Sequence, residues 1–297
     1  MKSTQEKDQK TLEQTISELT AIQKLMNKYV PLSRTDLNGD ITYINDAMCN
    51  ISGYSTDELL GKNHRVLRHP AEPKETFEEL WRCITQGENW EGELRSRRKD
   101  GSTFWVKVHI HPLHDQHNDI IGYQSLREDI TYRKELEFIA ANDKLTGVYN
   151  RRKFDELLQL ELDRAKRYDE TFSLILCDVD CFKKVNDTYG HLVGDQVLIK
   201  ITDSIKQSIR LSDVLARWGG EEFAILLPHT IQKDAETVAE KIRIGIETTL
   251  FESIGKMTIS CGVSQVQSSD DRSTLFQRAD DALYQAKEQG RNCIVCH

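Results

Sequence analysis

Apolar residues recur every seven positions near the start of the chain. Leu12, Leu19 and Met26 form one such series. A seven-residue apolar repeat over about three heptads is typical of a helix that packs along another helix. The pattern predicts a helix over residues 1–28, which ends before Pro31. The apolar seam could cover the chain's own next domain, but pairing with a second copy of the chain is the favoured interpretation.

Residues 32–130 alternate strand-like runs with turn signals. Asn38-Gly39 and Asp100-Gly101 are dipeptides that favour tight turns, and each lies between runs suited to strands. The order along the chain is strand, turn, strand, short helices and then three strands. It predicts a domain over residues 29–130 that consists of an antiparallel sheet with flanking helices.

Residues 131–142 have a strongly helical composition. Tyr132, Leu136 and Ile139 are spaced by four and three positions, which places them on one helix face. We expect a linker helix over 131–142 that pairs with its copy as a two-stranded coiled coil. A twist in such a pair would rotate the attached domains relative to each other. The simpler interpretation is that the helix only connects the two domains.

The second half of the chain combines buried strands with acidic segments. Residues 172–177 form an apolar run typical of a buried strand, which ends at Asp178 and Asp180. These two carboxylates would share one face if the strand continued. Farther along, Gly219-Gly220 separates two strand-like runs and predicts a type I′ hairpin turn with positive φ at both glycines.

The predicted hairpin carries Glu221 and Glu222 at its tip. Adjacent carboxylates repel each other, so a divalent cation is a natural partner, although a solvated acidic turn is the simpler alternative for this segment alone. Mg²⁺ commonly takes one or two carboxylates plus phosphate oxygens, which suits Asp178 at a strand end. Lys183 follows closely and can neutralise a phosphate group as a point charge.

Five motifs lie in order along residues 143–297. They are Asp143-x-Leu145-Thr146-Gly147, Asp178-x-Asp180-x-Phe182-Lys183-x-x-Asn186-Asp187, Gly190-His191-x-x-Gly194-Asp195, Gly219 to Phe223, and Tyr284-x-Ala286-Lys287-x-x-Gly290-Arg291-Asn292. With these motifs the segment resembles a GGDEF-family diguanylate cyclase domain in its GGEEF variant. The resemblance implies an α/β cyclase domain over 143–297 that joins two GTP molecules into cyclic di-GMP and releases two pyrophosphates.

The resemblance also implies roles for the motif residues. Two Mg²⁺ ions per active site would be held by the Asp178, Glu221 and Glu222 carboxylates and the Val179 carbonyl. Glu221 would also accept the proton of the attacking 3′-hydroxyl, although a metal-bound carboxylate is a weak base. Glu221, Glu222 and Lys183 make up the implied catalytic set.

Substrate and product sites follow from the same resemblance. The implied GTP-binding residues are Lys183, Asn186, His191, Asp195, Lys287 and Arg291. Arg210 and Asp213 form an RxxD sequence that matches the site where cyclic di-GMP inhibits the enzyme, although a charged turn before a strand has the same appearance. Because each domain holds one GTP, catalysis implies a homodimer, which we expect to form through the helices 1–28 and 131–142.

Residues 29–130 resemble a PAS domain, and more narrowly the FAD-binding PAS domains of aerotaxis and redox sensors. The supporting residues are Asn63-His64, Arg68-His69-Pro70, Phe77, Leu80-Trp81, Trp90-x-Gly92, Arg97 to Gly101 and Asp129-Ile130-Thr131. The resemblance implies that Asn45, Arg68, His69 and Trp90 line a flavin pocket. Ala71 departs from the aspartate usual in that subgroup. An empty or small-ligand pocket, and haem bound through a histidine, remain alternatives.

Composition limits the expected compartment and partners of the protein. The chain has 38% apolar and 30% charged residues, and no apolar run approaches a membrane span, so we expect a cytoplasmic protein without a membrane partner. The net charge of −8 without a basic stripe argues against nucleic acid. Seven scattered cysteines suggest reduced thiols.

Two further patterns have simpler explanations than metal or haem. The sequence Cys293-x-x-Cys296-His297 satisfies a haem-attachment signature, but it lies where the cyclase resemblance implies a final strand. The histidines 109, 111, 114 and 117 could hold Zn²⁺, although a solvated strand face and turn is the commoner arrangement.

The patterns predict an α+β protein, and the two resemblances imply that it is a sensor-regulated diguanylate cyclase. The alternatives are a non-catalytic effector that binds cyclic di-GMP or GTP, and a cyclase whose PAS domain serves only for dimerisation.

Overall fold

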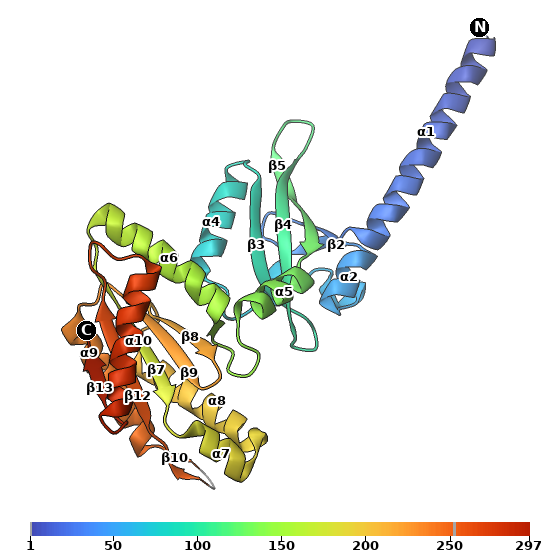
Figure 1. Ribbon diagram of the computed structural model, residues 1–297. Helices are drawn as coiled ribbons and strands as arrows, with labels where there is room; N and C mark the ends of the chain where they lie inside the picture. The colour runs from blue at the N-terminus through green and yellow to red at the C-terminus, as the bar shows by residue number, and fades with distance from the viewer. Residues whose placement is uncertain (1, 252–253) are drawn as a thin grey trace. The chain divides into compact units, whose positions relative to one another are not determined.

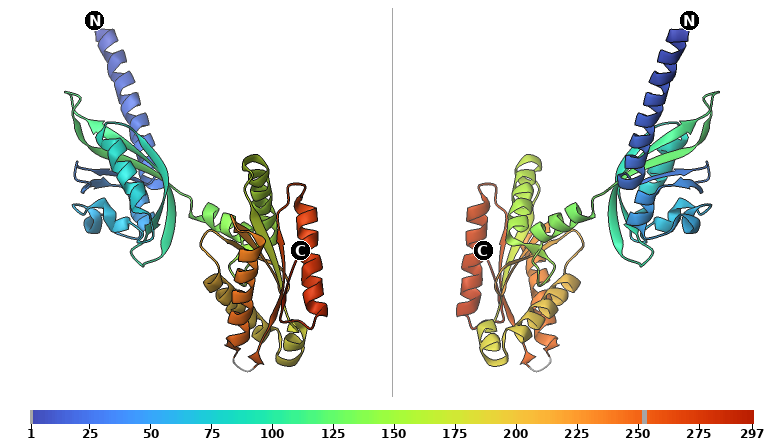
Figure 2. Two further views of the ribbon diagram at one scale, coloured as in Figure 1. Left: turned by 90° about the vertical axis from the view of Figure 1, so that its left-hand side faces the viewer. Right: turned by 90° about the vertical axis from the view of Figure 1, so that its right-hand side faces the viewer.

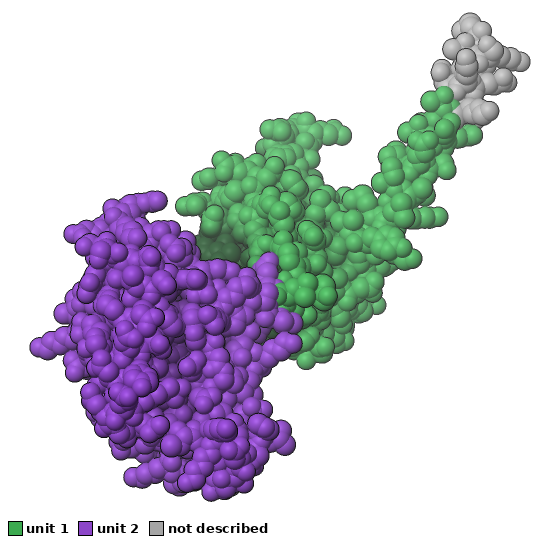
Figure 3. Space-filling model, in the orientation of Figure 1, with its two compact units in different colours: residues 1–136 green, residues 137–297 purple. Residues whose placement is uncertain are grey.

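The computed structural model describes residues 2–251 and 254–297, with side chains from residue 11 onward. The chain forms two compact units, residues 1–136 and 137–297, which are coloured separately in Figure 3. Each unit combines helices with its own β-sheet. This composition confirms the predicted α+β class.

The first unit begins with the long helix α1 (Lys2–Tyr29). Leu12 and Leu19 of its heptad series are each 60% exposed, so the unit does not cover this stripe. The C-terminal end of α1 is anchored where the Tyr43 hydroxyl donates to Asn27 Oδ1 at 2.9 Å. The apolar side chains of α1 are therefore available to another helix.

A five-stranded antiparallel sheet in the order β2-β1-β5-β4-β3 forms the core of the first unit (Figure 1). Alternate residues of β4 (Thr103–His114) are buried, among them Phe104, Val106 and Val108, because successive side chains on a strand point to opposite faces. The other elements are β1 (Leu32–Thr35), β2 (Ile41–Ile44), α2 (Asp46–Ser52), α3 (Thr56–Leu59), a 3₁₀ helix (His64–Leu67), α4 (Lys74–Thr85), β3 (Trp90–Arg97) and β5 (Ile120–Asp129).

The helix α5 (Thr131–Ala141) follows the first sheet and matches the predicted linker helix to within one residue. None of its residues is buried. Tyr132 and Ile139 are 72% and 53% exposed, so its apolar side chains, like those of α1, are left without a covering layer within either unit.

A six-stranded sheet in the order β13-β12-β7-β9-β8-β6 lies between helices in the second unit, as both views of Figure 2 show. β7 (Phe172–Val179) is an inner strand, antiparallel to both neighbours. Ile175 and Cys177 pack into one helical layer and Leu174 and Leu176 into the other. Burial on both faces explains why the segment is a continuous apolar run.

The second unit contains the following further elements. They are β6 (Tyr149–Asn150), α6 (Arg151–Tyr168), α7 (Phe182–Tyr189), α8 (His191–Ser208), β8 (Val214–Gly219), β9 (Glu222–Pro228), α9 (Gln232–Thr248), β10 (Leu250–Phe251), β11 (Gly255–Lys256), β12 (Ile259–Gln265), α10 (Arg272–Glu288) and β13 (Ile294–Cys296).

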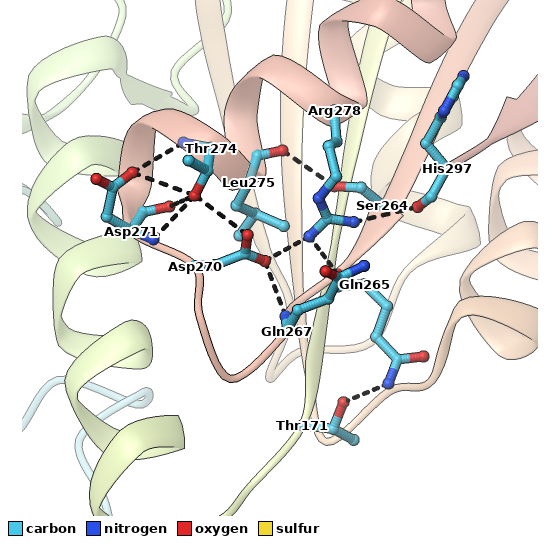
Figure 4. Close-up of polar contacts among 10 residues, drawn as sticks. All are labelled: Thr171, Ser264, Gln265, Gln267, Asp270, Asp271, Thr274, Leu275, Arg278 and His297. Atoms are coloured by element: carbon cyan, nitrogen blue, oxygen red, sulfur yellow. Dashed lines mark hydrogen bonds and ion pairs between the residues drawn. The ribbon is translucent and has the colours of Figure 1, made fainter.

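A polar network fixes the start of α10 (Figure 4). Asp270 is 4% exposed and forms a short ion pair with Arg278, whose Nη2 also donates to the Gln265 carbonyl oxygen at 2.8 Å. Asp271 caps the helix by accepting from the Thr274 backbone N–H at 2.8 Å. These contacts tie the helix to the end of β12, and so position the site residue Lys287 near its other end.

The two patterns that suggest metal or haem have local structural explanations. His109 Nδ1 lies 3.3 Å from Glu91 Oε2 on the neighbouring strand, and Cys296 belongs to β13, which pairs in parallel with β12. Among the side chains of residues 11–251 and 254–297, no three or more His, Cys, Asp or Glu form a ready-made metal site. Among the described helices, none is both long and apolar enough to cross a membrane.

Candidate active site

Residues from three distant segments meet at one end of β7. Asp178 is opposite Glu222 on β9, and Lys287 reaches the same point from α10. The Lys287 Nζ atom lies 2.8 Å from Asp178 Oδ2. Like charges directly opposite on neighbouring strands destabilise a sheet, so this position favours a cation.

The β8–β9 hairpin turn differs from the predicted one by one residue. Gly219 pairs with Glu222, so the turn residues are Gly220 and Glu221, and Gly220 has φ 51° while Gly219 does not have positive φ. The predicted type I′ turn with positive φ at both glycines is wrong. A register shift between Arg217 and Gly219 moves the turn along the chain. Arg217 Nε donates to the Gly220 carbonyl oxygen at 2.8 Å and holds this turn.

The turn residue Glu221 lies beside the end of β7. The Val179 backbone N–H donates to the Glu221 carbonyl oxygen at 3.2 Å, which brings the predicted oxygen ligands of both segments close together. Glu221 is half-buried, whereas Glu222 at the start of β9 is exposed. The structure therefore brings Asp178, Val179, Glu221 and Glu222 to one place.

Burial and mutual repulsion raise the pKa of two of these carboxyls. Burial is the largest cause for Asp178, and Glu221 and Asp180 raise its pKa further, while the ion pair with Lys287 opposes the shift. For Glu222, which is exposed overall, partial desolvation of the carboxyl raises the pKa most, followed by the negative charge of Asp178. The ammonium group of Lys287 therefore compensates only part of the negative charge of the acidic cluster, which consists of Asp178, Glu221 and Glu222.

The donor chemistry of this cluster fits Mg²⁺ better than it fits a metal enclosed by protein ligands. Carboxylate and carbonyl oxygens are hard ligands, and Mg²⁺ usually takes few protein ligands together with substrate phosphates. The predicted ligands Asp178, Glu221, Glu222 and the Val179 carbonyl are the groups that could supply these few oxygen atoms. The shortage of positive charge around Asp178 and Glu222 supports this fit.

Asp180 does not join the acidic cluster, because β7 ends before it. Its buried carboxylate accepts hydrogen bonds from Thr258 Oγ1 and Ser260 Oγ, each at 2.7 Å, and from the Asn292 backbone N–H at 3.0 Å. These bonds anchor the segment after α10, where Arg291 has φ 68° and an exposed side chain. The strand pattern alone did not reveal this anchoring role.

The predicted guanine-binding residues Asn186 and Asp195 lie on the neighbouring helices α7 and α8. Asn186 rests against α8 at Gly194, the residue before Asp195. A Cβ atom built on Gly194 would lie 2.0 Å from Asn186 Oδ1, so only glycine permits this approach. Both side chains are half-buried, which leaves their polar atoms partly open to a ligand.

Three predicted phosphate or substrate residues remain exposed. Lys183 lies in the first turn of α7, His191 begins α8, and Arg291 follows α10. Within the part of the chain that the structure describes, none of them has a hydrogen bond or ion pair to Asp178 or Glu222. The structure brings Lys287 to the carboxylates and leaves these three side chains at the surface.

An ion pair that supports the β8–β9 hairpin was not predicted from the sequence. Arg217 Nη1 lies 3.2 Å from Asp143 Oδ1, which also accepts from the Thr146 backbone N–H at 2.9 Å. Burial alone would raise the pKa of Asp143, but the hydrogen bonds from Thr146 and Arg217 bring it below its ordinary value. The Asp143 motif was visible in the sequence, but its distance from Arg217 along the chain hid the contact.

The RxxD segment forms a compact turn between α8 and β8. Asp213 Oδ2 accepts from the Arg210 backbone N–H at 2.7 Å, and the Asp213 N–H donates to the Arg210 carbonyl oxygen at 3.1 Å. The carboxylate is thus used within the turn, while the Arg210 side chain is exposed.

The first unit contains a cavity of about 610 Å³ between α4 and the sheet. Of the four residues predicted to line a flavin pocket, Arg68 lines this cavity. Its guanidinium lies 4.0 Å from the centre of the Phe77 ring, and its Nη2 donates to the Glu72 carbonyl oxygen at 3.3 Å.

The other three predicted flavin residues have local contacts outside the set that lines this cavity. Asn45 caps α2 by accepting from the Met48 N–H at 3.0 Å, and donates to the Val30 carbonyl oxygen at 2.7 Å. His69 Nδ1 accepts from the Ala71 N–H at 3.1 Å. Trp90 is 7% exposed and packs in the apolar core of the sheet.

Comparison with known proteins identifies both units. Residues 140–293 match the family "Diguanylate cyclase, GGDEF domain", and residues 41–127 match the PAS fold. The chain is 36% identical to the diguanylate cyclase DgcM of Escherichia coli over 203 residues, 66% of this chain and 48% of that protein. It is 31% identical to the response regulator PleD of Caulobacter vibrioides over 262 residues, 86% of this chain and 56% of that protein. The chain thus spans about half the length of these relatives.

The second unit also resembles a solved structure. The crystal structure of the coiled coil and GGDEF domain of DgcB from Caulobacter crescentus, in complex with c-di-GMP, superimposes with a TM-score of 0.54 and 30% identity. The match covers 56% of this chain and 90% of that one. Since the family match extends over more than half of the chain and includes the acidic cluster, the chain belongs to the GGDEF-domain diguanylate cyclase family and carries a PAS fold ahead of that domain.

Proposed function

We propose that the protein is a Mg²⁺-dependent diguanylate cyclase that condenses two GTP molecules into cyclic di-GMP and two pyrophosphates. The observation that supports this most directly is the meeting of Asp178, Glu221, Glu222 and Lys287 at the end of β7. Family membership supports the same conclusion.

The proposed division of labour follows the chemistry of the residues. Mg²⁺, held by the acidic cluster, would neutralise charge on the transferring phosphoryl group. Lys287 already lies at this cluster and, with Lys183 and Arg291, would bind the triphosphate, while Asn186 and Asp195 hydrogen-bond to guanine. The Glu221 carboxylate would accept the proton of the attacking 3′-hydroxyl, and His191 would contact substrate from the start of α8.

Two copies of the chain are needed because each domain would hold one GTP. The exposed apolar side chains of α1 and α5 support a homodimer through these helices. Such pairing brings two half-sites together and replaces an encounter in solution by a positioned reaction.

Regulation is proposed at two places. Arg210 has an exposed side chain and would bind cyclic di-GMP as an inhibitor, while Asp213 holds the turn that presents it. The cavity of the first unit would hold FAD, with Arg68 in its lining, and a change in flavin redox state would alter hydrogen bonding around the ring and so bias the helix α5. A PAS unit that serves only for dimerisation remains the alternative to flavin sensing.

The cyclase proposal is tested by substituting Glu221. Purified full-length protein with Mg²⁺ should convert GTP to cyclic di-GMP, and Glu221→Ala should lower kcat by about 10²-fold or more, comparable to the loss of a major electrostatic stabiliser. Glu236→Ala, which removes an exposed carboxylate from α9, should leave kcat unchanged. The measurement is product formation by liquid chromatography.

A wild-type protein that binds GTP or cyclic di-GMP but forms no product, in both oxidised and reduced states, would contradict the cyclase proposal. That outcome would favour the alternative of a non-catalytic effector.

A further inference from the structure

The cavity of the first unit has an apolar wall on the side of α4. Phe77, Leu80, Trp81 and Ile84 are spaced along one face of this helix and all line the cavity. Tyr123 lies opposite on the sheet, and its ring meets the Trp81 ring edge-on, with 5.7 Å between the centroids. A wall of this kind suits a flat or aromatic body.

The sheet side of the cavity carries a buried arginine. Tyr123, Ser125 and Arg127 alternate along β5, so they share one face, and all three line the cavity. Arg127 is 8% exposed. Its Nε donates to Ser125 Oγ at 3.0 Å, and its Nη2 lies 3.1 Å from His64 Nε2.

Arg127 keeps its charge without a compensating carboxylate. Burial lowers its pKa to about 10, so the guanidinium is still protonated at neutral pH. Burial, and then the charge of Arg127, lower the pKa of His64 to about 3, so the imidazole is neutral and can accept the hydrogen bond. Among the side chains described from residue 11 onward, no Asp or Glu forms an ion pair with Arg127.

The lining of the cavity as a whole is positively charged. Its ionised side chains include one carboxylate, Glu78, against five cations, which are Arg65, Arg68, Lys74, Arg95 and Arg127. Arg95 Nε is also buried without a hydrogen-bond partner within the described chain. A buried guanidinium without a counter-charge is costly, so a purely structural role for Arg127 explains the arrangement poorly.

We infer that this cavity binds a small molecule with a flat apolar body and an anionic carboxylate or phosphate group, and that Arg127 pairs with the anionic group. The inference rests on the proposed ligand-binding role of the first unit and is independent of cyclase activity. Arg127 is not one of the four residues predicted to contact flavin, so the inference adds an anion-binding residue to the flavin proposal.

Matched probe pairs test the inference on the full chain. Phenylacetate and phenylacetamide have nearly the same shape but differ by one charge, and FMN differs from riboflavin by its phosphate group. Binding is measured by quenching of tryptophan fluorescence, since Trp81 lines the cavity, and FAD is titrated separately. We expect at least one anionic probe to bind about tenfold or more tightly than its neutral partner, as a charge-assisted hydrogen bond allows.

Arg127→Met and Arg127→Gln should abolish this preference for the anionic probe. The glutamine variant keeps a hydrogen-bond donor toward Ser125 and His64, so it separates loss of the charge from loss of the hydrogen bonds. Arg65→Met removes an exposed cation from the same lining and should retain the preference. Without a probe, thermal unfolding of Arg127→Met should occur at a higher temperature than that of the wild type, whereas a purely structural arginine would give the opposite shift.

Equal binding of the charged and neutral members of both pairs, or a preference that survives both Arg127 substitutions, would overturn the inference. If FAD does not bind but phenylacetate shows an Arg127-dependent preference, the flavin proposal fails and the anion site stands. If FAD binds equally well to wild type and both Arg127 variants, and neither pair shows a preference, flavin stands and the anion site fails.

Discussion

The acidic cluster at the end of β7 carries more negative charge than Lys287 compensates. Asp178 and Glu222 are opposite each other on neighbouring strands, and both have raised pKa values because of burial and then repulsion, from Glu221 and Asp180 on Asp178 and from Asp178 on Glu222. Their ionised forms therefore oppose folding, whereas ionised carboxylates with lowered pKa values favour it. Binding of Mg²⁺ together with its nucleotide would remove this unfavourable repulsion between the carboxylates.

This imbalance predicts an unusual pH dependence for Glu222→Gln. The pKa of Glu222 is higher in the folded protein than in the unfolded chain. The protein therefore loses stability as the pH rises through the folded pKa, and shows no such loss below the unfolded pKa. In EDTA at neutral pH, Glu222→Gln should therefore raise the free energy of unfolding, by a few tenths of a kcal/mol because water screens the exposed carboxylate. The gain should shrink as the pH falls toward the ordinary carboxyl range.

Thermal unfolding across this pH range measures the effect, with Glu236→Gln on α9 as the control for removing an exposed charge. A constant difference between Glu222→Gln and wild type at every pH would contradict the electrostatic explanation. Added Mg²⁺ should stabilise the wild type more than Glu222→Gln.

Turns between elements present the functional side chains. The β8–β9 turn is fixed by Arg217, which in turn is held by Asp143, so residues far apart in sequence support Glu221. The α8–β8 turn is fixed by Asp213, and the side chain of Arg210 in it is exposed. In each turn one charged side chain, Arg217 or Asp213, holds the backbone, and a second charged residue, Glu221 or Arg210, lies in the turn.

The RxxD turn predicts separable effects of its two charged residues. Arg210→Ala should weaken inhibition by cyclic di-GMP by about tenfold or more while the initial rate stays nearly unchanged, because the side chain lies in an exposed turn outside the acidic cluster. Initial rates measured with increasing added cyclic di-GMP test this. Lys206→Ala removes an exposed cation from the last turn of α8 and is the matched control. Unchanged inhibition in Arg210→Ala would remove the assignment.

At the scale of the whole molecule, the two units are joined by a helix whose apolar residues are exposed. Leu12 and Leu19 of α1 and Tyr132 and Ile139 of α5 have no covering layer within their units. Exposed apolar stripes on long helices are typical of surfaces that pair with another helix. Pairing of copies would couple the PAS unit of each chain to the relative orientation of two cyclase domains.

Charges placed in the α1 stripe should prevent this pairing. The double variant Leu12→Glu and Leu19→Glu should shift the protein from dimer to monomer in sedimentation velocity, and lower cyclase activity per chain at the same concentration. Leu160→Glu, at a position of α6 that is 58% exposed, is the control for adding a charge at an exposed leucine. An undiminished dimer in the double variant would show that other surfaces hold the copies together.

Much of this protein is determined by local sequence. Heptad spacing indicates α1, turn dipeptides separate the strands of the first sheet, and the apolar run at 172–177 indicates β7, because side-chain periodicity follows directly from helix and strand geometry. The motif residues Asp178, Glu222 and Lys287 were also identifiable as a candidate site. Chain order alone, however, could not show that Lys287 contacts Asp178.

Tertiary structure decided what depends on register and on burial by distant segments. A one-residue shift in β8 moved the turn from Gly219-Gly220 to Gly220-Glu221, and turn type does not follow from local sequence when the pairing register is unknown. Burial between α4 and the sheet made Arg127 a cavity residue with an uncompensated charge, although its local sequence is ordinary. Contacts between residues far apart in sequence determine both outcomes, and these contacts exist only once the sheets have formed.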